Sequence, residues 1–188
     1  MLFRSDRTHV LIANWIYELP FLQRSDWASR AFGHWEVTGV YQYQSGMPVS
    51  VRSNDDFAGV GPGSGNQFWN LVGDPTIEPG PFTTSMAWFN PAAFARPAPG
   101  TFGVQPRNMI RNPGTWNFDL GVRKNVPLTG AQRVQFRAEA FNVLNHPNLG
   151  PAGATASAVN NNPNSGSFGF ITTKNGERVI QLSLKYSF

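Results

Sequence analysis

The last eleven residues of the chain, RVIQLSLKYSF (178–188), decide the fold class. From Ile180 onward, apolar or aromatic side chains take every second position, and polar side chains lie between them. The apolar set is Ile180, Leu182, Leu184, Tyr186 and Phe188. Because successive side chains of a β-strand point to opposite faces, this pattern predicts a strand with one apolar and one polar face. The chain ends on an aromatic residue.

Four further segments alternate with the same period of two. With 178–188 they predict five strands, the other four lying at about 9–19, 34–44, 116–124 and 133–141. The first is the least regular, because Val10, Ile12 and Ile16 lie on the face that should be polar. Strands of about 9–11 residues match the length that crosses a bilayer when tilted, whereas globular strands average about 5–6 residues.

The connections between these strands alternate in length. Segments 20–33 and 125–132 are short, whereas 45–115 and 142–177 are long. Short turns on one side and long loops on the other are typical of membrane β-barrels. This asymmetry places the carboxyl terminus on the short-turn side. Many aromatic residues lie among glycine and proline in the loop 45–115, which predicts that it folds on itself or over a pore.

Composition excludes several classes of protein. The 188 residues fit one domain or a piece of a larger one, and only 14% are charged, against about 25% in an average soluble domain. The absence of cysteine excludes disulfides, zinc–thiolate sites and cysteine nucleophiles. The net charge of +4 is spread along the chain rather than clustered, so we expect no nucleic-acid partner. The longest apolar run near the amino terminus is too short for a signal peptide, and none is expected in this chain.

No catalytic or metal-binding constellation emerges from the sequence. His9, His34 and His146 are far apart and lack ligand spacing. Asp55 and Asp56 fit no calcium-binding loop and read as parts of a solvated loop. The glycine-rich stretch 61–65 is not followed by the Lys-Ser/Thr of a phosphate-binding loop. We therefore expect neither an enzyme nor a bound cofactor or metal.

Several motifs point to one family. The stretches WFNPAAF (88–94), PAPGTFG (97–103) and RNPG (111–114) resemble TonB-dependent receptors of the Oar-like kind. The stretches NFDLGVRK (117–124), QFRAEAFN (135–142) and NHPN (145–148) are similar to the last hairpins of these receptors. The terminal YSF (186–188) resembles the aromatic end that the barrel assembly machinery reads. The resemblance covers about residues 9–188.

The resemblance implies that residues 1–188 are the C-terminal part of a TonB-dependent receptor β-barrel. They would supply the last five strands of a 22-stranded barrel in the bacterial outer membrane, with the carboxyl terminus in the periplasm. Their parts would be lipid-facing wall, lumen wall and two ligand-side extracellular loops, serving the energised uptake of a ligand. The implied partners are outer-membrane lipid, an upstream barrel and plug, the barrel assembly machinery, and TonB only through the plug.

Three groups of residues are candidate sites. The polar strand faces carry charges that we expect to face the lumen or plug and to pair across strands, namely Asp119, Arg123, Arg137 and Glu139. The apolar set of the final strand, Ile180, Leu182, Leu184, Tyr186 and Phe188, is expected to face the membrane and to carry the assembly signal. Aromatic residues of the first long loop, Trp69, Trp88 and Phe89, are the candidate ligand contacts.

Two alternatives remain from the residues themselves. A soluble β-sandwich that binds carbohydrate through exposed aromatic side chains shows the same alternation. A small self-assembling porin would complete one barrel from several copies. The apolar strand faces also carry Trp15, Trp35, Tyr41, Tyr43 and Trp116, which are girdle residues in a membrane and core residues in a sandwich. Loop lengths and the aromatic terminus favour the membrane, and the isolated chain is expected to be poorly soluble because its edge strands lack partners.

Overall fold

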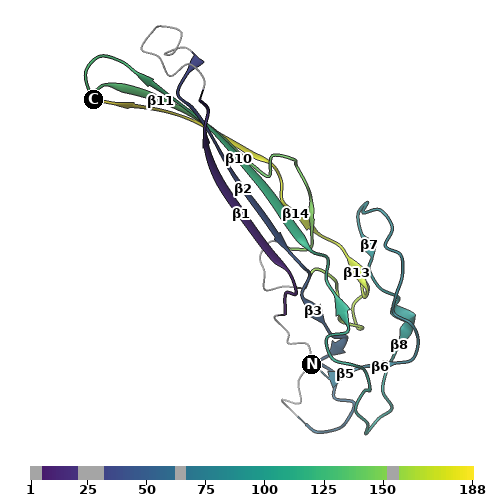
Figure 1. Cartoon of the computed structure of the whole chain (residues 1–188). Helices are drawn as coiled ribbons and strands as arrows, with labels where there is room; N and C mark the ends of the chain where they lie inside the picture. Colours follow the sequence, from purple (N-terminus) through teal and green to yellow (C-terminus); the bar gives the residue numbers. More distant parts are fainter. Residues whose placement is uncertain (1–5, 21–31, 62–66, 152–156) are drawn as a thin grey trace. The chain divides into compact units, whose positions relative to one another are not determined.

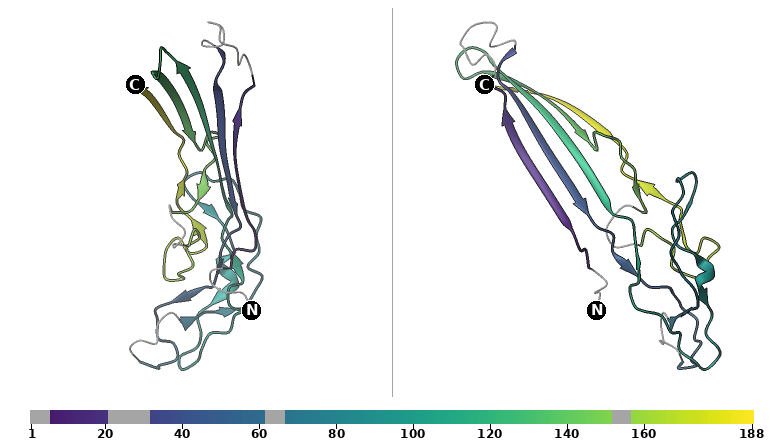
Figure 2. Two further views of the ribbon diagram at one scale, coloured as in Figure 1. Left: turned by 60° about the vertical axis from the view of Figure 1, so that its left-hand side comes forward. Right: turned by 45° about the vertical axis from the view of Figure 1, so that its right-hand side comes forward.

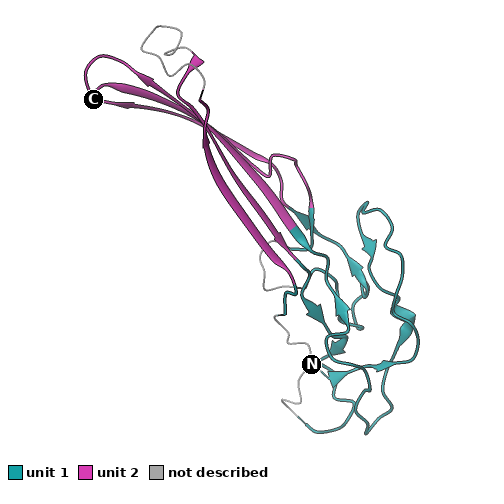
Figure 3. Cartoon of the chain, in the orientation of Figure 1, with its two compact units in different colours: residues 1–8, 45–115, 148–175 teal, residues 9–44, 116–147, 176–188 magenta. Residues whose placement is uncertain are grey.

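The computed structural model describes residues 6–20, 32–61, 67–151 and 157–188. The chain divides into two compact units, which are described separately (Figure 3). The sheet unit comprises residues 9–44, 116–147 and 176–188, and the loop unit comprises 1–8, 45–115 and 148–175. No helix among the described residues is long and apolar enough to span a membrane.

Five long strands form the sheet unit, and they run side by side (Figure 1). In spatial order they are β1 (Val10–Glu18), β2 (Trp35–Gln44), β10 (Thr115–Pro127), β11 (Arg133–Phe141) and β15 (Val179–Ser187). The chain direction reverses from each strand to the next, and the arrows in Figure 2 show this direction. The predicted all-β, antiparallel fold class is therefore confirmed.

The two ends of this sheet differ in their connections. Because neighbouring strands are antiparallel, the long connections 45–114 and 142–178 leave the sheet at one end, here called the long-loop end. The connections 19–34 and 128–132 lie at the opposite, short-turn end. The carboxyl terminus of β15 also lies at the short-turn end. Most of the connection 20–33, most of the glycine-rich stretch 61–65 and the first five residues lie outside the described residues.

Strand β10 is longer than its alternation predicts. The pattern indicates 116–124, whereas the strand spans Thr115–Pro127 and pairs with β11 as far as Pro127 opposite Arg133. The reason is that Lys124 is a charged residue on the face that is otherwise apolar. The alternation of apolar and polar residues therefore stops there, although the pairing with β11 continues. The turn closes where Gly130 has a φ of +64°, a left-handed conformation that glycine adopts without steric cost.

The register places the apolar side chains of neighbouring strands on one face. Phe136 lies opposite Leu184, and Val134 lies opposite Tyr186. These side chains are exposed along β15, with Leu184 at 74% of its full accessible area. A large apolar face left open to the surroundings is the feature that lipid would cover.

An aromatic cluster crosses strand β2 on the same face. Trp15 of β1 lies opposite Gly39, and its indole occupies the space that a side chain at Gly39 would need. The indole therefore reaches past β2 to Phe118 of β10, with ring centroids 5.7 Å apart. Tyr41 and Trp116 form a second contact between β2 and β10, at 6.2 Å.

The loop unit is held together by five short antiparallel strand pairs. They are β3 (Pro48–Val49) with β9 (Ile110–Arg111), β4 (Arg52–Ser53) with β5 (Gln67–Phe68), β6 (Asn70–Leu71) with β8 (Phe94–Ala95), β7 (Met86–Ala87) with β13 (Phe170–Ile171), and β12 (Asn148–Leu149) with β14 (Lys174–Asn175). A single 3₁₀ turn, η1 (Pro91–Ala93), follows Asn90, whose side chain accepts from the amide of Ala92. The β7–β13 pair joins the two long connections, so these loops fold together.

The buried hydrophobic core of the described chain lies in the loop unit. Its members are Val49, Val51, Phe57, Met86, Phe89, Ala93, Phe94, Ile110, Val159 and Ile171. None of the described residues of the sheet unit belongs to this buried set. The chain thus inverts the usual arrangement of a soluble β-protein: its loops are packed around a core, and its long strands expose their apolar side chains.

Candidate functional site

The polar face of the sheet unit gathers the charged side chains of four strands. The register of β11 with its neighbours sets Arg123 opposite Arg137, Asn125 opposite Gln135, and Gln135 opposite Lys185. Side chains opposite each other in a sheet share a face. Asp119, Arg123, Arg137 and Glu139, which the sequence groups together, therefore all lie on this face.

The ion pairs on this face do not join β10 to β11, contrary to the expectation from the sequence. Arg123 pairs with Glu36 of β2, a mostly buried carboxylate, rather than with a residue of β11. Arg137 pairs with Glu139 on its own strand, at 2.5 Å. The register explains the difference, because it sets Arg123 against another arginine and Glu139 against Gly121. The expected pairing between β10 and β11 was therefore wrong for these four residues.

Asp119 fastens the long-loop end of this face. Its Oδ1 accepts from the Asn117 side chain at 2.6 Å and from the Asn142 amide at 2.8 Å. Asn142 is 3% exposed with a φ of +50°, and its side chain donates to the carbonyls of His146 and Gly176. The residue thereby ties the end of β11 to the segment that enters β15. The role of Asp119 is thus local and structural.

His146, in the NHPN motif, also has a structural position. Its ring stacks on Trp116 with centroids 4.0 Å apart and planes 21° apart. Its amide donates to Asn142 Oδ1 at 3.0 Å. This motif therefore shapes the exit from β11, and no group of three or more metal-binding side chains occurs among the described residues.

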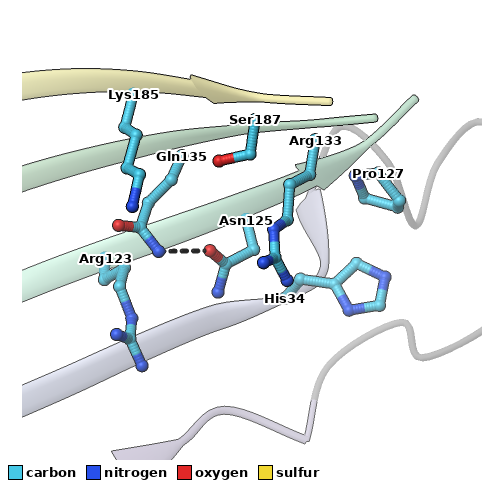
Figure 4. Close-up of a pocket in the computed structure, with 8 residues that line it drawn as sticks. All are labelled: His34, Arg123, Asn125, Pro127, Arg133, Gln135, Lys185 and Ser187. Atoms are coloured by element: carbon cyan, nitrogen blue, oxygen red, sulfur yellow. Dashed lines mark hydrogen bonds between the residues drawn. The ribbon is translucent and has the colours of Figure 1, made fainter. Parts of the chain in front are cut away.

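The short-turn end of the polar face contains a hollow of about 500 Å³ (Figure 4). Its lining residues are His34, Arg123, Asn125, Pro127, Arg133, Gln135, Lys185 and Ser187. Across it, Gln135 Nε2 donates to Asn125 Oδ1 at 2.8 Å. Sequence reasoning missed Arg133 and Lys185 as members of one site. They lie on separate strands, and only the register brings them together.

A cation also lies on the apolar face, near the short-turn end. Lys124 Nζ lies 4.9 Å from the centroid of the Trp35 ring and donates to the carbonyl of Gly33 at 2.9 Å. A lysine whose stem follows an apolar surface while its charge meets an aromatic ring and a carbonyl is typical of a membrane interface.

The structure places the three candidate ligand contacts in or against the core of the loop unit. Phe89 is 2% exposed and packs edge-on against Phe168 at 5.2 Å. The half-buried Trp69 donates its indole N–H to Ser53 Oγ at 3.1 Å, and Trp88 donates to the Arg111 carbonyl at 2.6 Å. Phe89 therefore offers no surface to a ligand in this conformation. A ligand role for Trp69 and Trp88 stays a prediction.

The carboxylates of the loop unit hold turns. Backbone N–H groups of Gly61 and Val60, at 2.8 and 3.1 Å, donate to Asp56 and lower the pKa of its carboxyl, with a further contribution from Gln67. The Asn164 side chain, followed by Ser53, lowers the pKa of Asp55 in the same way. Hydrogen bonds to the charged form favour ionisation. Both carboxylates are therefore stabilised as anions by the turns that they organise.

Comparison with known families assigns the chain. A family described as outer membrane beta barrel domain matches residues 2–181. The chain belongs to the outer membrane β-barrel domain family. Neither a curated protein nor a solved structure gave a match.

Membership of the outer membrane β-barrel family accounts for the open apolar face of the sheet unit. A β-sandwich needs a second sheet packed on that face. The described residues contain one large sheet and five two-stranded pairs that belong to the loop unit. The family assignment and this exposed face support the membrane barrel over the soluble sandwich, and they place the chain in the bacterial outer membrane.

Proposed function

We propose that this outer membrane β-barrel chain is the C-terminal part of a TonB-dependent, Oar-like receptor that takes up a ligand at the expense of energy. The observation that carries the proposal is the difference between its two units: the loop unit has a buried core, and the sheet unit exposes its apolar side chains. The motif WFNPAAF, on which the resemblance rests, forms the centre of the loop-unit core, because Phe89, Ala93 and Phe94 are all buried there. A loop region with its own core, attached to a lipid-exposed wall, suits a receptor better than a simple pore.

The direction of the edge strands supports a larger single barrel over a porin assembled from copies. Strands β1 and β15 are the first and last of five alternating strands, so they run in the same direction. Joining β15 of one copy to β1 of the next would make a parallel pair. A closed antiparallel wall therefore needs an odd number of further strands between these edges. A 22-stranded barrel meets this condition.

The lengths of the loops support one orientation of the wall in the membrane. In this family of barrels the short turns face the periplasm and the long loops face the outside. In the proposal, the loop unit lies on the ligand side and the carboxyl terminus faces the periplasm. The aromatic end at Phe188, which is 93% exposed, is then free for the barrel assembly machinery to bind. The polar face, with Asp119, Arg123, Arg137 and Glu139, lines the lumen and meets a plug.

A growth experiment tests energised uptake. A strain lacking this gene and a strain lacking TonB are compared with wild type on a panel of ferric chelates and oligosaccharides. The proposal predicts that both strains fail on the same compound and that the restored gene rescues the first strain. If the strain lacking this gene fails to grow on the compound while the TonB mutant grows normally, the protein is a passive pore instead.

Loop-unit variants in the complete receptor refine the same test. Trp69→Ala and Trp88→Ala are expected to reduce uptake of that compound, since both side chains keep some exposed surface beside the core. Uptake at the wild-type level in both variants would remove these residues from the ligand site and leave the receptor proposal standing.

A further inference from the structure

The hollow at the short-turn end of the polar face combines cations from three neighbouring strands. Arg123 lies on β10, Arg133 on β11 and Lys185 on β15, and His34 precedes β2 (Figure 4). Like charges on neighbouring strands repel one another, so such a cluster costs stability unless an anion compensates it. We therefore expect an anion to bind in this hollow and to compensate these charges.

The acids of the described residues compensate only part of this charge. Glu36 pairs with Arg123, and Glu139 pairs with Arg137, which lies opposite Arg123 and outside the hollow. Arg133 and Lys185 form no ion pair with a described residue. The Nε atom of Arg123 is buried and has no hydrogen-bond acceptor among the described residues. Counting the described residues alone, the hollow thus has more positive than negative charge, and it has donors without acceptors.

The spread of the cations indicates the kind of anion. From Arg123 on β10 to Lys185 on β15 the cations span two interstrand steps of about 4.8 Å, or roughly 10 Å in all. This distance exceeds what one phosphate or one carboxylate spans, and it suits several carboxylates along an extended peptide. The amide pair Asn125–Gln135 and the hydroxyl of Ser187 lie between the cations and offer partners for a peptide backbone.

A lipid headgroup is a poorer fit to this place. The lining residues Arg123, Gln135 and Lys185 share the polar face, whereas the lipid-facing side chains of β15 point to the opposite face. Arginine binds carboxylates in a bidentate manner, and lysine adds a mobile point charge. We propose that this hollow binds an acidic peptide segment on the inner, polar side of the wall. The proposal goes beyond the receptor function and does not depend on TonB or on the transported ligand.

Peptide binding to the full protein tests this proposal. The protein is extracted in mild detergent from the outer membrane of producing cells, and a fluorescent hexaglutamate peptide is titrated against it by anisotropy at low salt. The matched peptide contains six glutamines. The glutamate peptide is expected to bind with an affinity that falls steeply with salt, and the glutamine peptide is expected not to bind. Equal binding of both peptides, or binding that salt leaves unchanged, would overturn the proposal.

Matched single variants locate the site. Arg133→Gln and Lys185→Gln are each expected to weaken binding about tenfold, in line with the loss of a charge-assisted hydrogen bond. Arg137→Gln removes the same charge from the same face outside the hollow and should change affinity less than about threefold. Arg133→Lys keeps the charge and should retain most of the binding. Similar losses in Arg133→Gln and Arg137→Gln would mean that only the overall charge matters, which contradicts a built site.

Competition distinguishes the peptide from small anions. Inorganic phosphate and free glutamate are expected to displace the peptide no better than sodium chloride does at the same ionic strength. Displacement by phosphate well below the matched chloride concentration would assign the hollow to a small anion and overturn the peptide proposal. If a variant fails to assemble, the competition between phosphate and chloride on the wild-type protein still tests the proposal.

Discussion

Gly39 lets one aromatic side chain link three strands. The indole of Trp15 occupies the position that a Cβ atom at Gly39 would need, and it reaches Phe118 beyond β2. A glycine inside a strand normally weakens it, because it adds backbone entropy and packs no side chain. Here the loss is offset by aromatic contact across the strand, and the glycine is needed for close approach rather than for its φ angle.

Replacing this glycine tests the contact. Gly39→Ala forces the indole off the strand and breaks its contact with Phe118, so we expect a loss of about 1–3 kcal/mol in the free energy of unfolding, typical of overpacking. Urea unfolding of the protein in lipid vesicles, followed by tryptophan fluorescence, measures it. Gly80→Ala is the control, because a Cβ there meets nothing within 4 Å. A loss at Gly39 no larger than at Gly80 would contradict the close approach.

Asn142 combines three side-chain hydrogen bonds with a left-handed backbone conformation. Its amide group donates to two carbonyls and its Oδ1 accepts one backbone N–H, while its φ of +50° suits asparagine better than most residues. The sequence predicted this residue to follow the strand 133–141 directly, as the last residue of the motif QFRAEAFN. It did not predict the tie to Gly176, because that contact depends on two segments separated by a long loop.

Variants at Asn142 separate the side chain from the backbone conformation. Asn142→Gly keeps the left-handed backbone but loses the buried hydrogen bonds, and a loss of about 2 kcal/mol or more is expected in the free energy of unfolding. Asn142→Ala adds backbone strain and should be less stable than Asn142→Gly. Equal stability of Asn142→Gly and the wild type, in the same urea assay, would mean that the hydrogen bonds at this position contribute nothing.

The long strands could be predicted from the sequence, whereas the short strands of the loop unit could not. Period-two alternation reveals β15 and β11 directly, because one face meets an apolar environment and the other does not. The two-residue strands of the loop unit are too short to carry a pattern, and their pairs join segments far apart, such as β7 with β13. Aromatic density indicated a folded loop, but the partners of Phe89 and Trp88 depend on packing that no local pattern encodes.

The same limit applies to the candidate site. The polar face is readable from alternation, since Arg123, Arg137 and Glu139 all lie at polar positions. Which charges pair depends on register, and the register sets Arg123 opposite Arg137. Arg133 and Lys185 come together only through the pairing of β11 with β15. The face on which a side chain lies can thus be predicted from the sequence. Which side chains are neighbours on that face depends on how the strands pair in the sheet.

Neighbouring residues of β15 test which face meets lipid. Leu182→Arg puts a charge on the apolar face and should destabilise the folded barrel in vesicles by about 2–4 kcal/mol, the cost near the bilayer midplane. Ser183→Arg places the same charge on the polar face, beside Arg137 in the register, and should cost much less. The measurement is the free energy of unfolding in lipid vesicles. Equal costs, or a larger cost at Ser183, would contradict the assigned faces.

Three observations together describe the complete chain. The five long strands expose their apolar side chains, the loop unit encloses the buried core, and the chain belongs to the outer membrane β-barrel domain family. Because β1 and β15 run in the same direction, copies joined edge to edge would need a parallel seam. These features together favour a wall segment within one larger barrel.

Labelling the two ends of the sheet from outside the cell tests whether these strands form a membrane wall with the long loops outside. The chain has no cysteine, so Thr84→Cys in the loop unit and Thr129→Cys in the short turn each introduce one reactive site at an exposed position. With a maleimide too large to cross the outer membrane, we expect Thr84→Cys to be labelled on intact cells. Thr129→Cys should be labelled only after the membrane is permeabilised. Labelling of Thr129→Cys on intact cells, or none of Thr84→Cys, would contradict a barrel wall with its long loops outside.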